Sequence, residues 1–309
     1  MTHQDVLQDL LEKTSRTFAL TIPLLPEPTR REVGVAYLLF RIIDNFEDAT
    51  HWAPDKRIQA LHEFIRLMHD TSESSSTAAH VAVDGWLHEP PLEHAGYLEL
   101  LQLAPQVLAW HRALAPDARD RISKHLVRTA EGMAYFVGRA NAEGSLRLES
   151  RDELRDYCFV VAGIVGELLT ELYLLGDPAL APIGDALRER ARRFGEGLQL
   201  VNILKDALPD AQEGRIYLPP ELPLAEVFAL TRSDLVAALE YAEILRTGQA
   251  HPGVVAFNAL NARLALATLE ALNEHGFGSK LSRVQVSELT ADVMQRIHTG
   301  HSLLSGDLA

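Results

Sequence analysis

The sequence predicts an all-α protein, folded as a single helical domain over residues 1–309. Three observations lead to this prediction. Apolar residues recur at helical spacing along most of the chain, no segment alternates long enough to require a strand, and helix start signals occur at several places. Hydrophobic residues make up 47% of the 309 residues, which is enough for one large core.

Composition and charge restrict the class of protein. The net charge is -14 and no basic run offsets it, which argues against a nucleic-acid partner. Cys158 is the only cysteine, so no disulfide framework can form and a reducing cytoplasm fits the chain. We expect no signal peptide, because the first residues have neither a basic start nor an apolar core, and no membrane span, because no stretch reaches roughly 20 uninterrupted apolar residues. We therefore expect a soluble, cytoplasmic protein, for which peripheral membrane association remains open.

In the first half of the chain, helices alternate with short breaks. Thr29 and Glu32 form an expected capping box at the start of one long helix, and Pro116 separates two others. The Ser/Thr-rich segment 71–79 is expected to be a mobile loop. The other helices expected in this half span residues 4–14, 55–69, 92–114 and 118–137.

The second half continues the same pattern. Ser150 and Glu153 form a second expected capping box, and Ser282 with Gln285 gives a further start signal. Pro209 is expected to mark the last turn of its helix. The expected helices span residues 152–175, 188–208, 233–246, 253–274 and 283–298, with a turn and extended loop over 213–220.

A dense polar group falls on one face of the helix that starts at Thr29. Tyr37, Arg41, Asp44 and Asp48 are spaced four, three and four residues apart, with Glu47 beside them. Like charges this close are costly inside a protein unless a cation compensates them. Carboxylate oxygens suit a hard divalent ion, so the face predicts bound Mg²⁺. The alternative is a solvated helix end where acidic residues happen to cluster.

A second helix repeats this construction. Gln199, Asn202, Asp206 and Asp210 are spaced three, four and four residues apart, again on one face of an apolar helix. Two such faces around one cavity would hold a cluster of Mg²⁺ ions, which clamps a diphosphate and stabilises it as a leaving group. The expected metal ligands are Asp44, Glu47, Asp48, Asp206 and Asp210.

Together with their surroundings, the two faces resemble the squalene and phytoene synthases. The matching segments are residues 15–18, 37–48, 132–134, 157–166, 199–210 and 214–219, in the family's order. The resemblance covers nearly the whole chain. It implies a class I isoprenoid synthase bundle with a central active-site cavity, which joins two prenyl diphosphates head to head.

The resemblance also implies roles for single residues. Tyr157 would transfer a proton or stabilise a carbocation, with Arg41 and Tyr37 as further catalytic residues. The implied substrate-binding residues are Ser15, Arg16, Phe18, Gln199, Asn202, Lys205, Arg215 and Tyr217. The chain departs from the family's usual pattern in two places. Lys205 stands where arginine is more common, and Pro209 disfavours a helical Leu208, so Asp210 is expected to sit off the face.

Within the family, the runs around Tyr37 and Asp48 look closest to squalene synthases. That reading implies condensation of two farnesyl diphosphates to presqualene diphosphate, followed by NADPH-dependent reduction to squalene. Lys280 and Arg283, in a basic segment, are the expected NADPH contacts. One alternative is a phytoene, dehydrosqualene or hydroxysqualene synthase without hydride transfer, and another is a non-enzymatic relative that acts as an assembly factor. The sequence leaves open the donor chain length, farnesyl or geranylgeranyl, and the oligomeric state.

Overall fold

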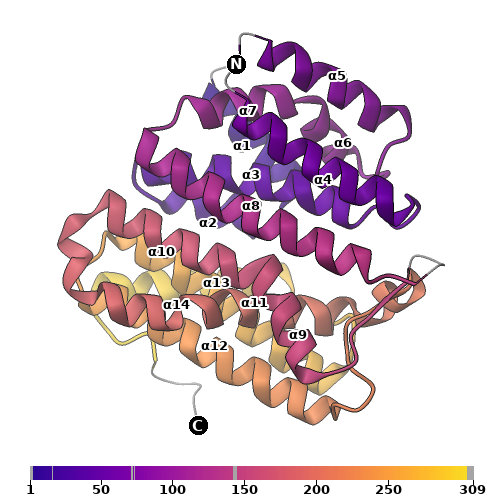
Figure 1. The fold of residues 1–309 in the computed structure, drawn as a ribbon. Coiled ribbons are helices and arrows are strands. Elements are labelled where there is room, and N and C mark those ends of the chain that lie inside the picture. Colours follow the sequence, from indigo (N-terminus) through magenta and orange to yellow (C-terminus); the bar gives the residue numbers. More distant parts are fainter. Residues whose placement is uncertain (1–2, 16, 71, 73, 142–144, 305–309) are drawn as a thin grey trace. The chain divides into compact units, whose positions relative to one another are not determined.

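The computed structural model describes residues 3–15, 17–70, 72, 74–141 and 145–304. These residues are almost entirely helical, as the sequence predicts, and they form two compact units (Figure 1). Unit 1 comprises Met1–Ile22 and Glu27–Gly144, and unit 2 comprises Pro23–Pro26 and Ser145–Ala309. The expectation of a single domain over residues 1–309 stays a prediction.

Unit 1 is built around helix α3 (Thr29–Glu47), which contacts α1, α4, α6, α7 and α8. Leu38, Leu39, Ile42 and Ile43 of α3 are all 0% exposed, because neighbouring helices cover every direction that these side chains take. The first polar face is therefore carried by a core helix. The other helices of this unit are α1 (His3–Thr14), α2 (Phe18–Thr21), α4 (Pro54–His69), α5 (Ser75–His88), α6 (Ala95–Gln102), α7 (Ala104–Arg112) and α8 (Pro116–Gly138).

Three local predictions in unit 1 are corrected. The capping box is wrong, because Thr29 already lies inside α3 and the N-cap residue is Pro28, with no side-chain cap. The helix expected over 92–114 is divided into α6 and α7 at Leu103, since Pro105 has no N–H to continue the hydrogen bonds of α6. The loop expected over 71–79 is shorter, because residues 75–79 belong to the first turns of α5.

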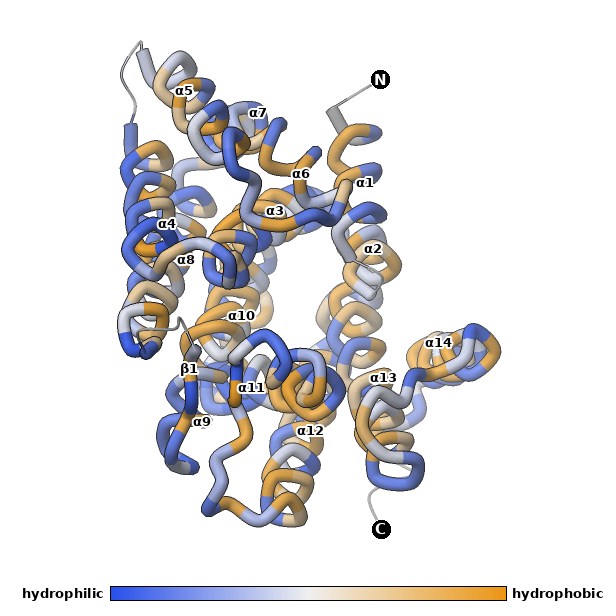
Figure 2. Tube along the Cα trace, turned by 90° about the vertical axis from the view of Figure 1, so that its right-hand side faces the viewer, coloured by the Kyte–Doolittle hydropathy of each residue, from blue (hydrophilic) through white to orange (hydrophobic). Residues whose placement is uncertain are grey.

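Unit 2 is built around the long helix α11 (Gly184–Gln212), which contacts α9, η2, α10, α12 and α13. Helix α10, which packs against α11, is hydrophobic over most of its length (Figure 2). The remaining elements are η1 (Ile22–Leu24), which spans the boundary between the units, and β1 (Leu146–Arg147), α9 (Arg151–Cys158), η2 (Phe159–Gly163), α10 (Ile164–Gly176), η3 (Pro178–Ile183), β2 (Arg215–Ile216), α12 (Leu224–Thr247), α13 (Pro252–His275) and α14 (Arg283–Thr299).

The start signals in unit 2 are largely confirmed. Ser150 caps α9 by accepting from the N–H of Glu153, whereas the Glu153 side chain accepts from the N–H of Glu149 instead of closing the box. Ser282 and Gln285 form a complete capping box at α14. The extended loop after α11 is confirmed too, with a two-residue parallel pairing between β1 and β2 that the sequence did not predict.

Helix α11 continues through Pro209 to Gln212, beyond the end expected at Leu208. Proline so close to a helix end removes only the hydrogen bond to the carbonyl of Lys205, so the helix can still complete its last turn. Asp210 therefore keeps the helical register of the second polar face, and the expectation that it sits off that face is wrong.

The helix expected over 152–175 is a continuous run, Arg151–Gly176, made of α9, η2 and α10. Its middle section, η2, is a π-helical turn. Among the described residues this run alone is long and apolar enough to cross a membrane, but half of its most apolar window is buried inside the protein. All three of its sections contact α11.

Candidate functional site

The first polar face lies on the last turns of α3, in unit 1. The Arg41 guanidinium lies 5.7 Å from the ring centroid of Tyr37 and 5.5 Å from that of Tyr97. Its Nη1 atom is 3.2 Å from Oδ2 of Asp44, one turn further along. Nε of Arg41 is buried and has no hydrogen-bond partner among the described residues. The guanidinium therefore keeps unused donor capacity, as suits a group that binds an anion.

The electrostatics of this face differ from those of a solvated helix end. Burial raises the pKa of Asp44 to about 6, and the charge of Asp48 adds to the rise although Arg41 opposes it. Burial works against a charged Arg41, but Asp44 and the two tyrosines outweigh it and raise the pKa of the guanidinium. A carboxylate whose ionised form is disfavoured has more to gain from a divalent cation than a solvated one has.

Asp48 and Glu47 are two further carboxylates, and they lie where the first polar face ends. Asp48 is the C-cap residue of α3, and its N–H donates to the carbonyl of Asp44 at 2.8 Å. Glu47 is 4% exposed, and its backbone carbonyl accepts from the guanidinium of Arg57. The predicted carboxylate cluster of α3 is thus fixed by helix geometry and by a neighbouring helix.

The N-terminal segment joins the same face. The hydroxyl of Ser15 accepts from the N–H of Phe18 at 2.9 Å, which fixes the turn into α2. The Phe18 ring lies 5.4 Å from the ring of Tyr37, and the Tyr37 hydroxyl donates to the carbonyl of Thr14 at 3.0 Å. Arg16 lies outside the described residues. The predicted residues Ser15 and Phe18 are therefore joined to each other, and Phe18 lies beside Tyr37 of this face.

The second polar face lies on α11, in unit 2. Lys205 pairs with Oδ2 of Asp206 at 3.0 Å and donates to Oδ1 of Asn202 at 3.3 Å. The side chain of Asp206 is 44% exposed, Asn202 is exposed and Gln199 is half-buried. Lys205, which was expected to bind substrate diphosphate, thus pairs with the adjacent carboxylate of Asp206.

The end of this face is joined to the loop that follows it. Nη2 of Arg215 lies 2.8 Å from Oδ1 of Asp210 and 2.9 Å from Oε2 of Glu213. The side chains of Arg215 and Asp210 are only 13% and 16% exposed. The sequence separately assigned Asp210 to metal and Arg215 to diphosphate, and the structure pairs them directly.

Tyr157 and Tyr217 form a second pair in unit 2. The Tyr157 hydroxyl donates to the Tyr217 hydroxyl at 3.0 Å, and the two rings stack with centroids 4.5 Å apart. They are 3% and 6% exposed. The candidate catalytic tyrosine of α9 is therefore held by a residue from the loop after α11.

Lys280 and Arg283 lie apart from both faces along the chain. Lys280 lines a groove of about 540 Å³ formed by α13, α14 and the turn between them, and Arg283 is exposed at the start of α14. Four carboxylates line the same groove: Glu270, Glu274, Glu288 and Asp292. Glu270 pairs with Arg232 at 3.6 Å and Asp292 with Arg296 at 2.7 Å, so the two other carboxylates are the ones that disfavour a phosphate group beside Lys280. The NADPH role of Lys280 and Arg283 stays a prediction.

Sequence reasoning missed several residues of the two faces. Nothing in the chain pattern links Tyr97 to Arg41, because their contact joins α3 to a separate helix. The sequence pattern could have identified Glu196, since it lies three residues before Gln199 and extends the second face by one turn.

The donor set fits a hard divalent cation, because half-buried carboxylates of α3 carry charge that a cation would neutralise. In the part of the chain that the structure describes, no three His, Cys, Asp or Glu side chains are grouped to hold a metal ion. The predicted Mg²⁺ site stays a prediction.

A model of the family described as squalene/phytoene synthase matches residues 11–238, a span that contains both polar faces and both tyrosines of the pair. The chain belongs to the squalene/phytoene synthase family. Among its relatives, the squalene synthase of Schizosaccharomyces pombe is 30% identical over 216 residues, which are 69% of this chain and 43% of that protein. Human squalene synthase is 29% identical over 212 residues, 69% of this chain and 45% of that protein. The chain thus matches less than half the length of these relatives.

Solved structures support the same family fold. The complex of TcSQS with the ligand BPH1237 has a TM-score of 0.71 and 22% identity, and the match covers 99% of this chain and 92% of that one. A dehydrosqualene synthase in complex with a ligand has a TM-score of 0.58 and 18% identity, covering 96% of both chains. These likenesses confirm the helical isoprenoid synthase fold expected for the squalene/phytoene synthase family. The central cavity stays a prediction.

Proposed function

We propose that this protein is a squalene synthase, which condenses two farnesyl diphosphates head to head to presqualene diphosphate and reduces that product to squalene. One observation supports the proposal above others. Two core helices, α3 and α11, each present an aspartate face with a basic side chain beside an aspartate, within the part of the chain that matches the family model.

The α3 face would receive one diphosphate. Arg41 would donate to its oxygens, because Nε is without a partner among the described residues and the charge is maintained by Asp44. Mg²⁺, when bound to the carboxylates, would neutralise the leaving diphosphate. The Phe18 and Tyr37 rings would keep water from the guanidinium and orient it.

The α11 face would receive the second diphosphate. Lys205 would contribute a mobile positive charge and Arg215 a planar fork, already oriented by Asp210. Gln199 and Asn202 would donate hydrogen bonds from their amides. The allylic cation left by one donor would be attacked by the double bond of the other, and proton loss would then close the cyclopropane ring. Tyr157 would accept that proton or stabilise the cation, with Tyr217 as its hydrogen-bond partner.

A second candidate function is favoured by the groove at Lys280. The carboxylates there argue against a phosphate contact at Lys280, so the basic segment assigned to NADPH gives the hydride step no support. Proton loss would then give dehydrosqualene or phytoene, and water capture would give a hydroxylated product. For both candidates we propose a prenyl diphosphate substrate, a cytoplasmic location and peripheral membrane contact for release of an apolar product.

Product analysis by gas chromatography tests these proposals. Purified protein is supplied with Mg²⁺ and with farnesyl or geranylgeranyl diphosphate, each with and without NADPH. Squalene from farnesyl diphosphate, formed only with NADPH, is the expected result. The same thirty-carbon product at the same rate without NADPH would replace squalene synthase by the second candidate. No product from either donor would favour a non-enzymatic family relative.

A further inference from the structure

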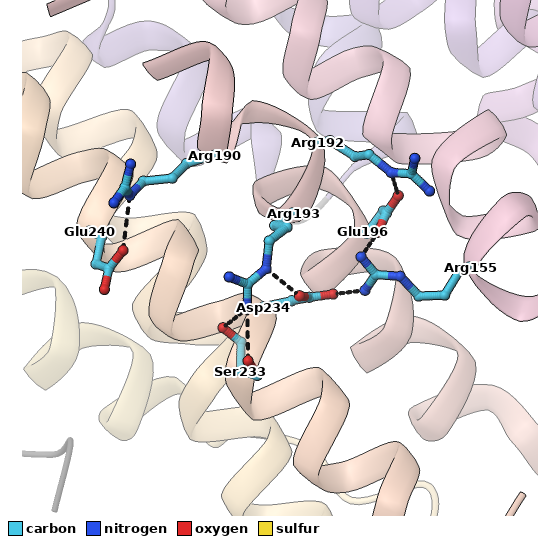
Figure 3. Close-up of polar contacts among 8 residues, drawn as sticks. All are labelled: Arg155, Arg190, Arg192, Arg193, Glu196, Ser233, Asp234 and Glu240. Atoms are coloured by element: carbon cyan, nitrogen blue, oxygen red, sulfur yellow. Dashed lines mark hydrogen bonds and ion pairs between the residues drawn. The ribbon is translucent and has the colours of Figure 1, made fainter. Parts of the chain in front are cut away.

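A network of ion pairs lies beside the second polar face, inside unit 2 (Figure 3). Arg155 of α9 contacts two carboxylates: Nη2 is 2.5 Å from Oε2 of Glu196 in α11, and Nη1 pairs with Oδ2 of Asp234 in α12. Nε of Arg193 donates to Oδ1 of Asp234 at 2.7 Å. The side chains of Glu196 and Asp234 are 0% and 2% exposed. Two carboxylates almost without solvent contact therefore join three helices.

Glu196 also contacts the π-helical turn η2. A Cβ atom on Gly163, the last residue of the turn, would lie 3.3 Å from Cγ and 3.4 Å from Oε1 of Glu196. At the first residue of the turn, the guanidinium of Arg192 lies 4.4 Å from the ring centroid of Phe159, and Nε of Arg192 pairs with Glu196. One carboxylate thus holds both ends of the π-helical turn.

Helix α11 approaches this run backbone to backbone. A Cβ on Gly195 would lie 2.0 Å from the carbonyl oxygen of Ala162, and one on Gly166 would lie 2.0 Å from that of Ala191. The position of η2 along α11 is therefore sterically defined, and any shift of the turn would move Tyr157, two residues before it. Such π-helical turns occur frequently at functional sites.

We propose that Arg155, Glu196 and Asp234 form a clamp that fixes the π-helical turn against α11 and so positions Tyr157 relative to Gln199. Gln199 lies one turn after Glu196 on the same face of α11, so one helix carries both the clamp and the second polar face. The clamp residues are positioning residues, and their role rests on the proposed function of Tyr157. Buried ion networks rarely stabilise a protein more than apolar packing does, whereas they can fix a unique register.

The sole cysteine of the chain reports on this clamp. Cys158 lies between Tyr157 and Phe159 in sequence and is 0% exposed. Burial raises the pKa of its thiol, and the charge of Glu196 raises it further. A closed clamp therefore keeps Cys158 unreactive toward an alkylating reagent, and a loosened clamp lets the reagent in.

The test compares Glu196→Gln and Asp234→Asn with a matched control, Glu240→Gln. The control breaks the Arg190–Glu240 pair, 2.9 Å long, which joins the same two helices, α11 and α12, away from η2 (Figure 3). Iodoacetamide labelling of Cys158 and steady-state turnover of farnesyl diphosphate are measured on each folded protein. In the clamp variants we expect labelling to rise and kcat to fall about tenfold, with KM within about threefold, and the control to match the wild type.

Loss of one partner from a buried pair can unfold a protein, so the double variant Arg155→Met/Glu196→Leu supplies a second test. It removes both charges and keeps apolar bulk, which permits folding. We expect the folded double variant to show low kcat and fast labelling. Wild-type labelling and kcat in the folded variants would overturn the clamp, and so would equal effects of Glu240→Gln. If the wild type makes no prenyl product, the proposed function fails, whereas Cys158 labelling still decides whether the clamp exists.

Discussion

The two polar faces are alike in sequence and different in surroundings. On α3 the Asp44 side chain is 30% exposed and the paired guanidinium is flanked by two aromatic rings. On α11 the Asp206 side chain is 44% exposed, and its partner is a lysine on the adjacent residue. Asp44 is therefore more enclosed than Asp206, whereas Asp210, at the end of the α11 face, is more enclosed than either at 16% exposed.

The packing of each helix explains this difference. Helix α3 is contacted by five other helices, and its Asp44 side chain is less exposed than that of Asp206 in α11. The acidic end of α11 is followed by a turn and the extended loop that carries Arg215. Spacing in the sequence thus determines which side chains share a face, and the neighbouring elements determine how much an ionised carboxylate costs there.

The largest expected effect comes from removing one aspartate charge from either polar face. Asp44→Asn and Asp206→Asn should each lower kcat by about 10³-fold or more, since both faces are proposed to stabilise a leaving diphosphate. Turnover is measured with farnesyl diphosphate at saturating Mg²⁺, and circular dichroism checks the fold. Full activity in either variant would remove that face from the proposed metal site.

Arginine removal should separate catalysis from stability on the two faces. Arg41→Ala and Arg215→Ala should each lower kcat/KM by about 10²-fold, because both are proposed to contact diphosphate. Arg215→Ala should also lower the melting temperature more, since its side chain and that of its partner Asp210 are 13% and 16% exposed, against 24% and 30% for Arg41 and Asp44. A larger melting-temperature loss in Arg41→Ala would contradict this ranking by enclosure.

The raised pKa of Asp44 predicts that the Asp44→Asn variant is more stable than the wild type, by an amount that depends on pH. Because the folded-state pKa is about 6 and the unfolded-state value lies lower, ionised Asp44 destabilises the folded protein as pH rises toward 6. Without added Mg²⁺, Asp44→Asn should be about 1 kcal/mol more stable than wild type above pH 6, and this gain should shrink toward pH 4. Thermal unfolding across this range measures it. Asp206→Asn, at the more exposed carboxylate, is the control. An equal gain in stability in that variant would contradict the difference drawn between Asp44 and Asp206.

The smallest effect concerns residues that belong to neither face. Because acidic groups surround Lys280, the pair Lys280→Ala/Arg283→Ala should change the conversion of presqualene diphosphate by no more than about threefold. Single-turnover assays with NADPH follow the two half-reactions separately. A tenfold slower second half-reaction, with presqualene diphosphate accumulating, would instead support the predicted NADPH role of these residues.

Helix periodicity was the part of the fold that the sequence made predictable. The spacing of Asp44 and Asp206 placed each on its helical face, and Ser282 marked the start of α14 correctly. The sequence predicts one helix over residues 152–175, and it does not show the π-helical turn η2 inside that helix. Tyr97 and Asp234 could not be found, because their contacts with Arg41 and Arg155 depend on how separate helices pack. Local pattern carries no information on such pairs.

The short pairing of β1 with β2 has a consequence for the order of folding. Leu146 lies opposite Arg215, and two backbone hydrogen bonds, from Leu146 to Gly214 and from Leu148 to Ile216, close this long chain segment. Closing it costs roughly 4 kcal/mol of chain entropy, more than two hydrogen bonds return at about 1 kcal/mol each. We expect this contact, and with it Arg215 and Tyr217, to form only after α9, α10 and α11 have assembled. Pulsed hydrogen exchange should therefore show the amides of Leu146 and Leu148 protected later than those of α11, and the first to exchange in the native protein.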